Sequence, residues 1–517
     1  MKKIYLSLFM AGGLLATSCS MNELPEGTLN DETAISTEQD AMNFRNGIYV
    51  NLRSITNGSY IAYTEMQTDM FVGTVTNGNR LGMMSLGTFL ASDTDLEPLW
   101  ANTYSDIAAV NYFLPKVDGM IEGAEGDSKV RLQRYRGEAK FARAYYYYFL
   151  ADKYCNSYTV IDPTTPASGV PLVTTYNPSG DYASYPGRST LAEVFTQIEK
   201  DLNEAYADLS AFESSSLSDA KSQLAPNASY LSTYAVTALQ ARIALLKGDW
   251  ATAITKAEQV IGTNGSSPFE LCDDLSYETM WTNDEGSELI FVPFGNQAQS
   301  GAVAALGEAW IMADGISADY VCTQNALDLY PTLDDDVRYY TFIQDRSLNI
   351  EGRDVVSPCF IKYPGNPALN TGSVNAMKNN SKPFRLSEMY LIVAEAAAEA
   401  GQTQKANDAL NAIRTARIYG YQAQQYVGAN LISEVRLERM RELIGEGHRI
   451  SDLRRWRQGF QRSVAYTNPV YGDVPAALVS AGKSVSYTVG DYRYLLPIPT
   501  GEMETNPQLA GQQNPGF

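Results

Sequence analysis

The sequence predicts a mostly α-helical protein built from pairs of packed helices. In residues 382–417, apolar side chains recur every three or four positions in two runs that meet at Gly401. Residues 230–261 repeat the same pattern around Gly248. Both stretches are rich in alanine, which is small enough to let two helices approach closely. A helical pair of this kind cannot bury its apolar face alone, so further pairs are expected beside it.

Residues 230–261 resemble a tetratricopeptide unit, and residues 382–417 form a second copy in the same style. In such a unit a glycine turns the chain and alanines permit tight helix–helix contact. The residues that carry the resemblance are Ala238, Leu239, Leu245, Gly248, Asp249, Trp250, Ala253, Ile254, Ala257 and Val260.

Four helices earlier in the chain are expected to form two weaker pairs. One of them opens with Thr190 and Glu193 in the spacing of a capping box. About four helical pairs in all would make a curved, tetratricopeptide-like scaffold. The weaker pairs are residues 37–53 with residues 100–120, and residues 131–154 with residues 189–209.

Two long stretches lack helical periodicity. Residues 54–99 are dominated by Gly, Asn, Thr and Ser, and residues 264–381 are irregular and aromatic. Loops held by a rigid scaffold are where binding residues usually lie. We therefore expect a single domain with a large irregular, loop-rich insertion. The domain is expected to span residues 37–517. Its expected parts are a helical scaffold at residues 37–263 and 382–460, a ligand-binding loop region at residues 264–381 and an extended tail at residues 461–517.

The N-terminus has the features of an export signal. Lys2 and Lys3 precede an apolar run, residues 4–16, that is too short to span a membrane. The small residues before Cys19 resemble a bacterial lipoprotein signal. We expect residues 1–18 to be removed, Cys19 to be lipidated and residues 19–36 to serve as anchor and tether. The alternative is plain secretion, with Cys19 removed or unmodified.

Composition excludes several classes of function. The net charge of −20 argues against nucleic-acid binding, which needs basic patches. His448 is the single histidine, which disfavours histidine-based metal sites and catalytic triads. No two of the five cysteines form a CxxC pair, so zinc-ribbon and redox motifs are absent. Besides Cys19, the cysteines are either free and buried or paired in one of three ways; they are Cys155, Cys272, Cys322 and Cys359.

Three stretches together are typical of one family. They are RLSEMYLIVAEAAAEAG (residues 385–401), ERMRELIGEGHRISDLRRW (residues 438–456) and YRYLLPIPTGEMETNPQLAGQQNPGF (residues 492–517). With these stretches the chain resembles the SusD/RagB family of outer-membrane lipoproteins. The lipoprotein-type signal and the stretch GEAKFARAYYYYFLADKY (residues 137–154) add to the resemblance, which runs from Cys19 to Phe517.

The resemblance implies a surface-exposed nutrient-binding protein that acts as a lid on a SusC-like TonB-dependent transporter of the outer membrane. The implied ligands are oligosaccharides or polysaccharide fragments, or peptides in a RagB-like branch. No catalysis, cofactor or metal is implied. Two other functions stay open: a surface glycosidase, for which no acid/base pair of carboxylates stands out, and a tetratricopeptide scaffold that binds only proteins.

We expect the ligand site where residues 69–80 meet residues 276–320 of the insertion. Sugar binding needs flat aromatic faces together with groups that hydrogen-bond hydroxyls. Asp69, Asn77 and Arg80 would supply hydrogen bonds. Trp281, Trp310 and Tyr320 would supply aromatic platforms, although each tryptophan could equally belong to the core.

Other polar clusters have structural interpretations that we favour. Residues 446–449 suggest catalysis but suit a joint between two helices better. Residues 93–97 alternate acidic side chains without the spacing of a calcium-binding loop, and residues 334–336 suit a helix start. Among residues 145–148, four consecutive tyrosines, some are expected to point outward. Trp100, Trp250 and Trp456 lie in helical patterns and are expected to pack.

Overall fold

The computed structural model describes most of the chain. It covers residues 34–517 except residues 77–79, 264, 313, 332–334, 351, 463–466, 469–471 and 474–484. The expected signal peptide, the lipidation residue Cys19 and the ligand residue Asn77 therefore lie outside the described residues. Within the described ranges, no helix is both long enough and apolar enough to cross a membrane.

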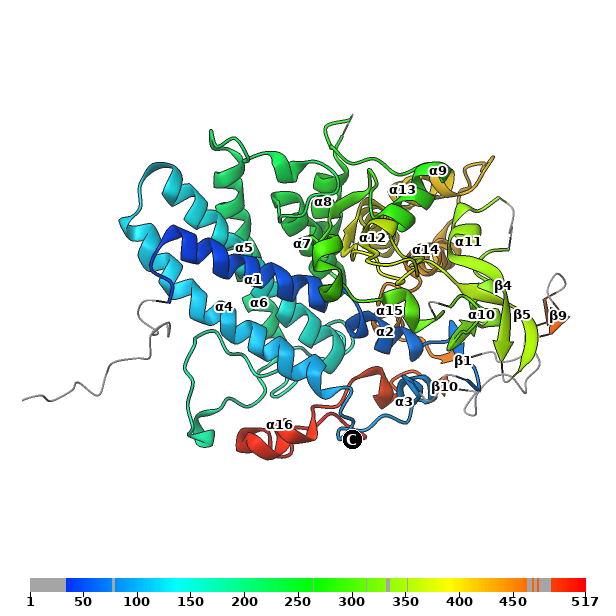
Figure 1. Cartoon of the computed structure of the whole chain (residues 1–517), viewed down its shortest axis with the longest axis horizontal. Coiled ribbons are helices and arrows are strands. Elements are labelled where there is room, and N and C mark those ends of the chain that lie inside the picture. The colour runs from blue at the N-terminus through cyan, green and yellow to red at the C-terminus, as the bar shows by residue number, and fades with distance from the viewer. Residues whose placement is uncertain are drawn as a thin grey trace, which may run out of the picture.

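Helices dominate the structure, and the strands are short (Figure 1). The helices are α1 (Glu38–Ile55), α2 (Ser59–Met66), α3 (Gly82–Leu86), α4 (Glu97–Gly123), α5 (Gly126–Tyr154), α6 (Leu191–Glu213), α7 (Thr233–Lys247), α8 (Trp250–Ile261), α9 (Asp274–Asn283), α10 (Gln324–Leu327), α11 (Val337–Phe342), α12 (Leu386–Glu399), α13 (Thr403–Arg417), α14 (Gly428–Leu443), α15 (Arg449–Arg455) and α16 (Thr500–Thr505). The strands are β1 (Phe71–Gly73), β2 (Leu289–Phe291), β3 (Tyr320–Cys322), β4 (Ile343–Ile350), β5 (Arg353–Phe360), β6 (Phe384–Arg385), β7 (Phe460–Gln461), β8 (Thr467–Asn468), β9 (Gly472–Asp473) and β10 (Ser486–Tyr487).

The two strongest expected helical pairs are confirmed as α7–α8 and α12–α13. Gly248 and Gly401 make the turns between their helices, both at φ +72°, a left-handed conformation that glycine adopts without strain. Helix α8 packs against α12, so the two pairs adjoin although the insertion separates them in sequence. An ion pair of 2.6 Å between Arg242 of α7 and Glu388 of α12 reinforces this contact. The mostly α-helical fold class is therefore confirmed.

The weaker pairs form a packed group at the N-terminal end of the scaffold. Helix α5 packs against α6 as expected, and α1 packs against both α4 and α5 (Figure 1). The capping box expected at Thr190 and Glu193 begins α6. A second capping box, formed by Thr37 and Asp40, begins α1. Each box satisfies backbone N–H groups that the first helical turn leaves without a partner.

The tyrosines of residues 145–148 are more enclosed than expected. Tyr145, Tyr146 and Tyr147 are buried, and Tyr148 is half-buried, so the expectation that some point outward into solvent is wrong. The reason is that α5 is surrounded by neighbouring helices on several sides rather than lying on the surface. The expected packing role of the helical tryptophans is confirmed for Trp100 and Trp456, which are buried.

The insertion is less irregular than its sequence suggests, because it has a core of its own. Strands β4 and β5 form an antiparallel hairpin. Trp281, Trp310, Phe342 and Phe360 pack together in this second core. Segments from before the insertion join it, since β1 pairs antiparallel with β3. Figure 1 shows this second body beside the helical scaffold, with α9, α11 and the β4–β5 hairpin.

The four cysteines of the described residues are free and buried. They are Cys155, Cys272, Cys322 and Cys359. Of the alternatives left open by the sequence, the structure shows unpaired thiols inside the core. Burial raises the pKa of the Cys322 and Cys359 thiols, the latter to about 12, so both stay protonated at neutral pH.

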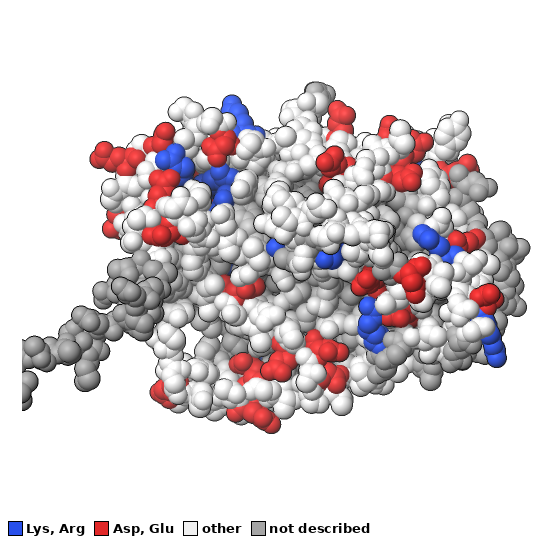
Figure 2. Space-filling view, viewed as in Figure 1, with Lys and Arg blue, Asp and Glu red and all other residues white. Residues whose placement is uncertain are grey.

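One face of the molecule is hollowed in its lower part. Figure 2 shows the hollow between the region of α4 and the strip that carries α16. Asp and Glu side chains gather on that strip in this view. Negatively charged side chains therefore lie beside the hollow on this face.

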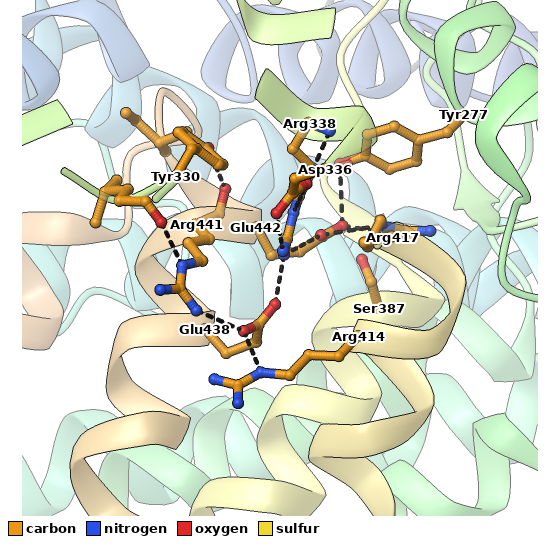
Figure 3. Close-up of polar contacts among 12 residues, drawn as sticks. Tyr277, Tyr330, Asp336, Arg338, Ser387, Arg414, Arg417, Glu438, Arg441 and Glu442 are labelled. Atoms are coloured by element: carbon orange, nitrogen blue, oxygen red, sulfur yellow. Dashed lines mark hydrogen bonds and ion pairs between the residues drawn. The ribbon is translucent and has the colours of Figure 1, made fainter. Parts of the chain in front are cut away.

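A buried network of ion pairs joins the scaffold to the insertion (Figure 3). The carboxylate of Glu442, on α14, lies 2.9 Å from Arg385, 3.1 Å from Arg417 and 3.3 Å from Arg338. The Tyr277 hydroxyl donates to the same carboxylate at 3.2 Å. Burial opposes the charge of Glu442, but the three guanidinium groups hold the pKa of Glu442 well below its ordinary value. One side chain thus links α14 to α9, α11, β6 and α13.

Glu438, one turn earlier on α14, extends the network. It pairs with Arg338 at 2.6 Å and with Arg414 at 2.7 Å. Burial by itself would raise the pKa of Glu438, but the arginines outweigh this effect and lower the pKa to about 2. Asp336 caps the first turn of α11 and pairs with Arg338 at 2.8 Å, which confirms the helix start expected at this acidic cluster.

We predict that Glu442→Gln lowers the free energy of unfolding by about 3–5 kcal/mol, because it removes the carboxylate that three buried guanidinium groups share and leaves excess positive charge in the buried network. Glu434→Gln is the matched control on the same helix, since Glu434 is 31% exposed and pairs with Arg414. It should cost about 0–1 kcal/mol. Chemical denaturation followed by tryptophan fluorescence measures both. Equal losses of unfolding free energy in the two variants would show that the buried network stabilises the fold no more than a partly exposed ion pair does.

Candidate functional site

The two segments expected to form the site do meet. Phe71 pairs with Cys322 and Gly73 with Tyr320 across the β1–β3 ladder. The Thr323 hydroxyl donates to the carbonyl oxygen of Asp69 at 2.6 Å. Beyond β1, Arg80 forms an ion pair with Asp319. The residues around position 70 and the insertion are therefore fixed against one another.

The aromatic residues expected as platforms are buried. Trp281 is 1% exposed, and Trp310 and Tyr320 are 0% exposed. Stacking on a sugar needs an exposed ring face, so the expectation that these three rings form a platform is wrong for this conformation. The physical reason is that the insertion uses its large aromatic side chains to build its own core. Cations cover Trp281, with Lys362 at 4.4 Å and Lys382 at 4.9 Å from its ring centroid.

The expected polar residues have different surroundings. Asp69 is 4% exposed, and both its oxygens accept from Arg449 of α15, at 3.0 and 3.1 Å. Asp69 therefore anchors α15 rather than facing solvent. The side chain of Arg80 is 39% exposed, even though it pairs with Asp319 and donates to the carbonyl oxygen of Glu308. Of the expected polar residues that the structure describes, Arg80 is the accessible one.

Residues 444–448 form the joint between α14 and α15. The Glu65 carboxylate of α2 accepts from the backbone N–H of Gly447 at 2.6 Å and of Gly445 at 3.3 Å. Burial raises the pKa of Glu65 to about 7, although the two hydrogen bonds act in the opposite direction. Burial and the nearby cations, Arg242 among them, hold the pKa of His448 well below its ordinary value, so its imidazole is neutral. The arrangement is the structural joint favoured by the sequence.

A small polar cavity lies beside this joint. Its volume of about 70 Å³ suits a few water molecules rather than a sugar chain. The charged side chains around it are already paired: Lys153 with Asp152 at 2.9 Å, and Lys382 with Asp284 at 2.7 Å. This cavity is therefore part of the packing between scaffold and insertion.

A cleft of about 110 Å³ opens beside α3 and is reached from the surface. We call it the α3 cleft. Burial and the carboxylate of Asp95 raise the pKa of Tyr63, which places the phenol near that carboxylate. Asp95 is exposed, and so is Leu90 on the same segment. The lining residues are Tyr63, Leu81, Gly82, Met83, Met84, Asp93, Thr94, Asp95 and Leu96.

The α3 cleft offers hydrogen-bonding groups beside apolar side chains, which is the combination that a sugar ring requires. The backbone N–H of Leu90 donates to Asp93 at 2.8 Å, which orders the segment. Among the described residues, no group of three or more His, Cys, Asp or Glu side chains is arranged to hold a metal ion.

Two larger clefts flank a loop that the sequence indicated only as a connection. Their volumes are about 500 and 600 Å³, and both are lined by residues 174–176. Sequence reasoning missed them because residues 158–188 are rich in proline and glycine. The signal that could have found them is the recurrence of Tyr176, Tyr182 and Tyr185 in a loop, where no helical core requires aromatic side chains.

The chain matches two family descriptions. Residues 360–517 match the SusD family, and residues 25–244 match a SusD-like family described as starch-binding and associating with the outer membrane. Together the two stretches span well over half of the sequence. The chain belongs to the SusD/RagB family. Among curated proteins, none matches the sequence.

Solved structures share the fold over nearly the whole chain. A SusD superfamily protein from Bacteroides thetaiotaomicron is 25% identical, with a TM-score of 0.74 over 93% of this chain and 100% of that one. A laminarin binding SusD-like protein is 22% identical, with a TM-score of 0.67 over 93% and 100%. Surface glycan-binding protein A from Bacteroides fluxus has the same identity of 22%, TM-score of 0.67 and coverage of 93% and 100%.

We predict that Glu65→Gln gains stability over the wild-type protein as the pH rises. Below about pH 4.5 the carboxyl is protonated in both the folded and the unfolded wild-type chain. Between that pH and about 7 only the unfolded chain loses the proton, so wild-type stability falls. Across this pH window the free energy of unfolding of the variant should rise by roughly 3 kcal/mol relative to that of the wild-type protein. Denaturant titrations at pH 4.5 to 8 test it, and parallel curves would contradict it.

Proposed function

We propose that this protein is a lipid-anchored protein of the cell surface that captures glycan fragments and delivers them to a SusC-like TonB-dependent transporter in the outer membrane. The observation that carries the proposal is membership of the SusD/RagB family, whose SusD-like description at residues 25–244 is starch-binding and outer-membrane-associated. Capture uses stacking and hydrogen bonds, and closure of the protein over the transporter hands the ligand on. No bond is broken in this scheme.

The α3 cleft is the primary ligand site in this proposal. Its lining begins at Leu81, the residue that follows Arg80 at the end of the segment 69–80 expected from the sequence to bind the ligand. The exposed carboxylate of Asp95 and the Tyr63 phenol would accept and donate hydrogen bonds to sugar hydroxyls. Met83 and Leu90 would cover the apolar face of a ring. Of the six residues expected from the sequence, Arg80 keeps its proposed role and Asn77 stays a prediction.

The position of the single histidine favours binding without catalysis at the α3 cleft. The single histidine, His448, lies in the α14–α15 joint, where it is held neutral. It does not line the α3 cleft. Peptide capture by a RagB-like relative and hydrolysis of a glycosidic bond are the competing outcomes that the following experiment separates.

We predict that the mature chain without its lipid, residues 20–517, is retarded in affinity electrophoresis by at least one polysaccharide of a panel that begins with starch and laminarin. Retardation that a peptide mixture does not relieve identifies a glycan ligand. Retardation relieved by peptides identifies the RagB-like alternative, and release of sugar from the polysaccharide identifies a hydrolase. Both of these results contradict the proposal.

Asp95→Ala should weaken the binding of the retarding polysaccharide about tenfold, because a hydrogen bond to a charged group contributes about 1.5–3 kcal/mol. Asp408→Ala is the control, since Asp408 is an exposed carboxylate on α13, where it contacts Gln404 of the same helix. Isothermal titration of both variants measures the change. Unchanged affinity in Asp95→Ala would remove the α3 cleft as the site.

We predict that Cys19→Ala leaves the protein out of the membrane fraction, because lipid attachment at Cys19 is the proposed anchor. Cell fractionation and incorporation of labelled palmitate measure the effect, with the wild-type chain as reference. A wild-type chain that carries no label, or a variant that stays in the outer membrane, would contradict the anchor.

A further inference from the structure

We propose that a second carbohydrate-binding site lies under the tyrosine loop, defined as residues 171–186, and that it holds a more distant part of the same glycan that reaches the α3 cleft. The inference rests on the proposed function for the class of ligand. Its own basis is the geometry of the loop, of the two clefts beside it and of the α16 segment that connects it to the α3 cleft.

The first arm of the tyrosine loop is held rigidly by the scaffold. The Tyr104 hydroxyl of α4 donates to the carbonyl oxygen of Pro171 at 2.8 Å. The Tyr147 hydroxyl of α5 donates to the carbonyl oxygen of Val173 at 2.6 Å and accepts from the backbone N–H of Val173 at 2.7 Å. A binding surface fixed before the ligand arrives loses less entropy on binding.

Further polar side chains continue this attachment. Asn111 of α4 donates to the carbonyl oxygen of Val173 at 2.9 Å, and Arg143 of α5 donates to that of Thr174 at 3.3 Å. Arg143 is itself oriented by Asp201 of α6 at 2.7 Å. The loop backbone next to the clefts is thus bound to two long helices, α4 and α5, while α6 orients one of the side chains that hold it.

Exposed aromatic side chains leave the loop where it departs from the scaffold. Tyr176 is 47% exposed and Tyr182 is 55% exposed. Tyr176 packs edge-on against Tyr112 of α4, with ring centroids 5.1 Å apart, and Tyr182 packs edge-on against Tyr185 at 5.6 Å. Each exposed ring therefore has a supporting neighbour that limits its motion. Supported tyrosines with open faces are suited to the apolar faces of sugar rings.

The two clefts give Tyr176 and Tyr185 room for a ligand. The α16-side cleft, of about 500 Å³, lies between α4, the tyrosine loop and α16, and it is lined by Tyr104, Tyr176, Tyr185, Glu502 and Asn506 among others. The α5-side cleft, of about 600 Å³, is also lined by Tyr176. Both clefts are several times larger than the α3 cleft, so they have room for more of a sugar chain. Tyr176 lines both clefts, and we refer to the two together as the groove.

The polar groups of the groove match a carbohydrate. Glu502, on α16, offers carboxylate oxygens in the α16-side cleft. In the α5-side cleft the ion pair of Lys140 and Glu204, 2.7 Å apart, offers both a donor and an acceptor. Hydroxyl groups of sugars both donate and accept, so mixed groups of this kind beside tyrosine rings favour a glycan over a purely apolar ligand.

The segment around α16 connects this groove to the α3 cleft. The backbone N–H of Thr500 donates to the carbonyl oxygen of Ala91, next to the lining residues 93–96 of the α3 cleft. At the other end, Asn506 donates to the carbonyl oxygen of Pro186 at 2.9 Å and Gln508 donates to that of Ala183. In Figure 1, α16 lies along the lower edge of the molecule, between this loop and α3. The α16 segment therefore contacts residues beside both sites, and a glycan that occupies both would pass along it.

The test uses Tyr176→Ala and Tyr185→Ala, the two loop tyrosines that line the clefts, in the mature chain without its lipid. Removing one aromatic contact should weaken binding of the retarding polysaccharide roughly threefold to tenfold. Tyr419→Ala is the matched control, because Tyr419 is 85% exposed and follows α13, far along the chain from the loop. Isothermal titration with starch, laminarin or the polysaccharide of the panel that retards the wild-type chain most gives the affinities.

Chain length makes the test specific. Binding of the long polysaccharide should weaken in the loop variants, whereas binding of its di- or trisaccharide at the α3 cleft should stay at the wild-type value. Wild-type affinity of both loop variants for the polysaccharide would overturn the second site. Thermal unfolding of each variant checks the fold, and Tyr185→Ala keeps the test decisive if Tyr176→Ala folds poorly.

The two proposals fail in different ways. If the wild-type chain binds no polysaccharide of the panel, the proposed function fails and the second site falls with it. If the wild-type chain binds and Asp95→Ala weakens binding while both loop variants match Tyr419→Ala, the proposed function stands and the second site alone is refuted.

Discussion

The buried carboxylate of Glu442 is the contact on which the arrangement of this molecule depends. It receives guanidinium groups from three separate segments, on β6, α11 and α13, and none of these groups reaches solvent. Burying an ion in this way is costly unless its partners are held in place. The network therefore favours one placement of the insertion on the scaffold, because any other would leave several charges buried without partners.

That constraint determines where binding chemistry can be. With the insertion fixed, its aromatic residues close into a second core, and Trp281 and Trp310 are used to fill it. What remains accessible lies at the periphery, in segments that the helices hold by their backbones. The α3 cleft and the tyrosine loop are both of this kind, and the α16 segment contacts residues beside each. A rigid scaffold with shallow peripheral clefts is suited to holding an extended ligand.

Much of the fold could be predicted, because the features that specify it are local. The period of three to four residues at 230–261 and 382–417 forms helices wherever the chain places them, and Gly248 and Gly401 turn the chain as expected. The capping box of Thr190 depends on residues three positions apart. The site was harder to predict. Whether Trp310 faces a ligand or a core depends on the pairing of β1 with β3. These strands come from distant parts of the sequence, Phe71–Gly73 and Tyr320–Cys322.

The amino-acid sequence alone determined the helical scaffold, the family resemblance and the interpretation of residues 446–449 as a joint, since each rests on spacing within a few turns of chain. Only the tertiary structure decided which aromatic side chains are exposed. Burial is a property of distant segments coming together: it enclosed Tyr145, Tyr146 and Tyr147 on α5 and left Tyr176 and Tyr182 open on a loop. Local pattern carries no information about such contacts, so the accessible tyrosines became visible only once the chain was folded.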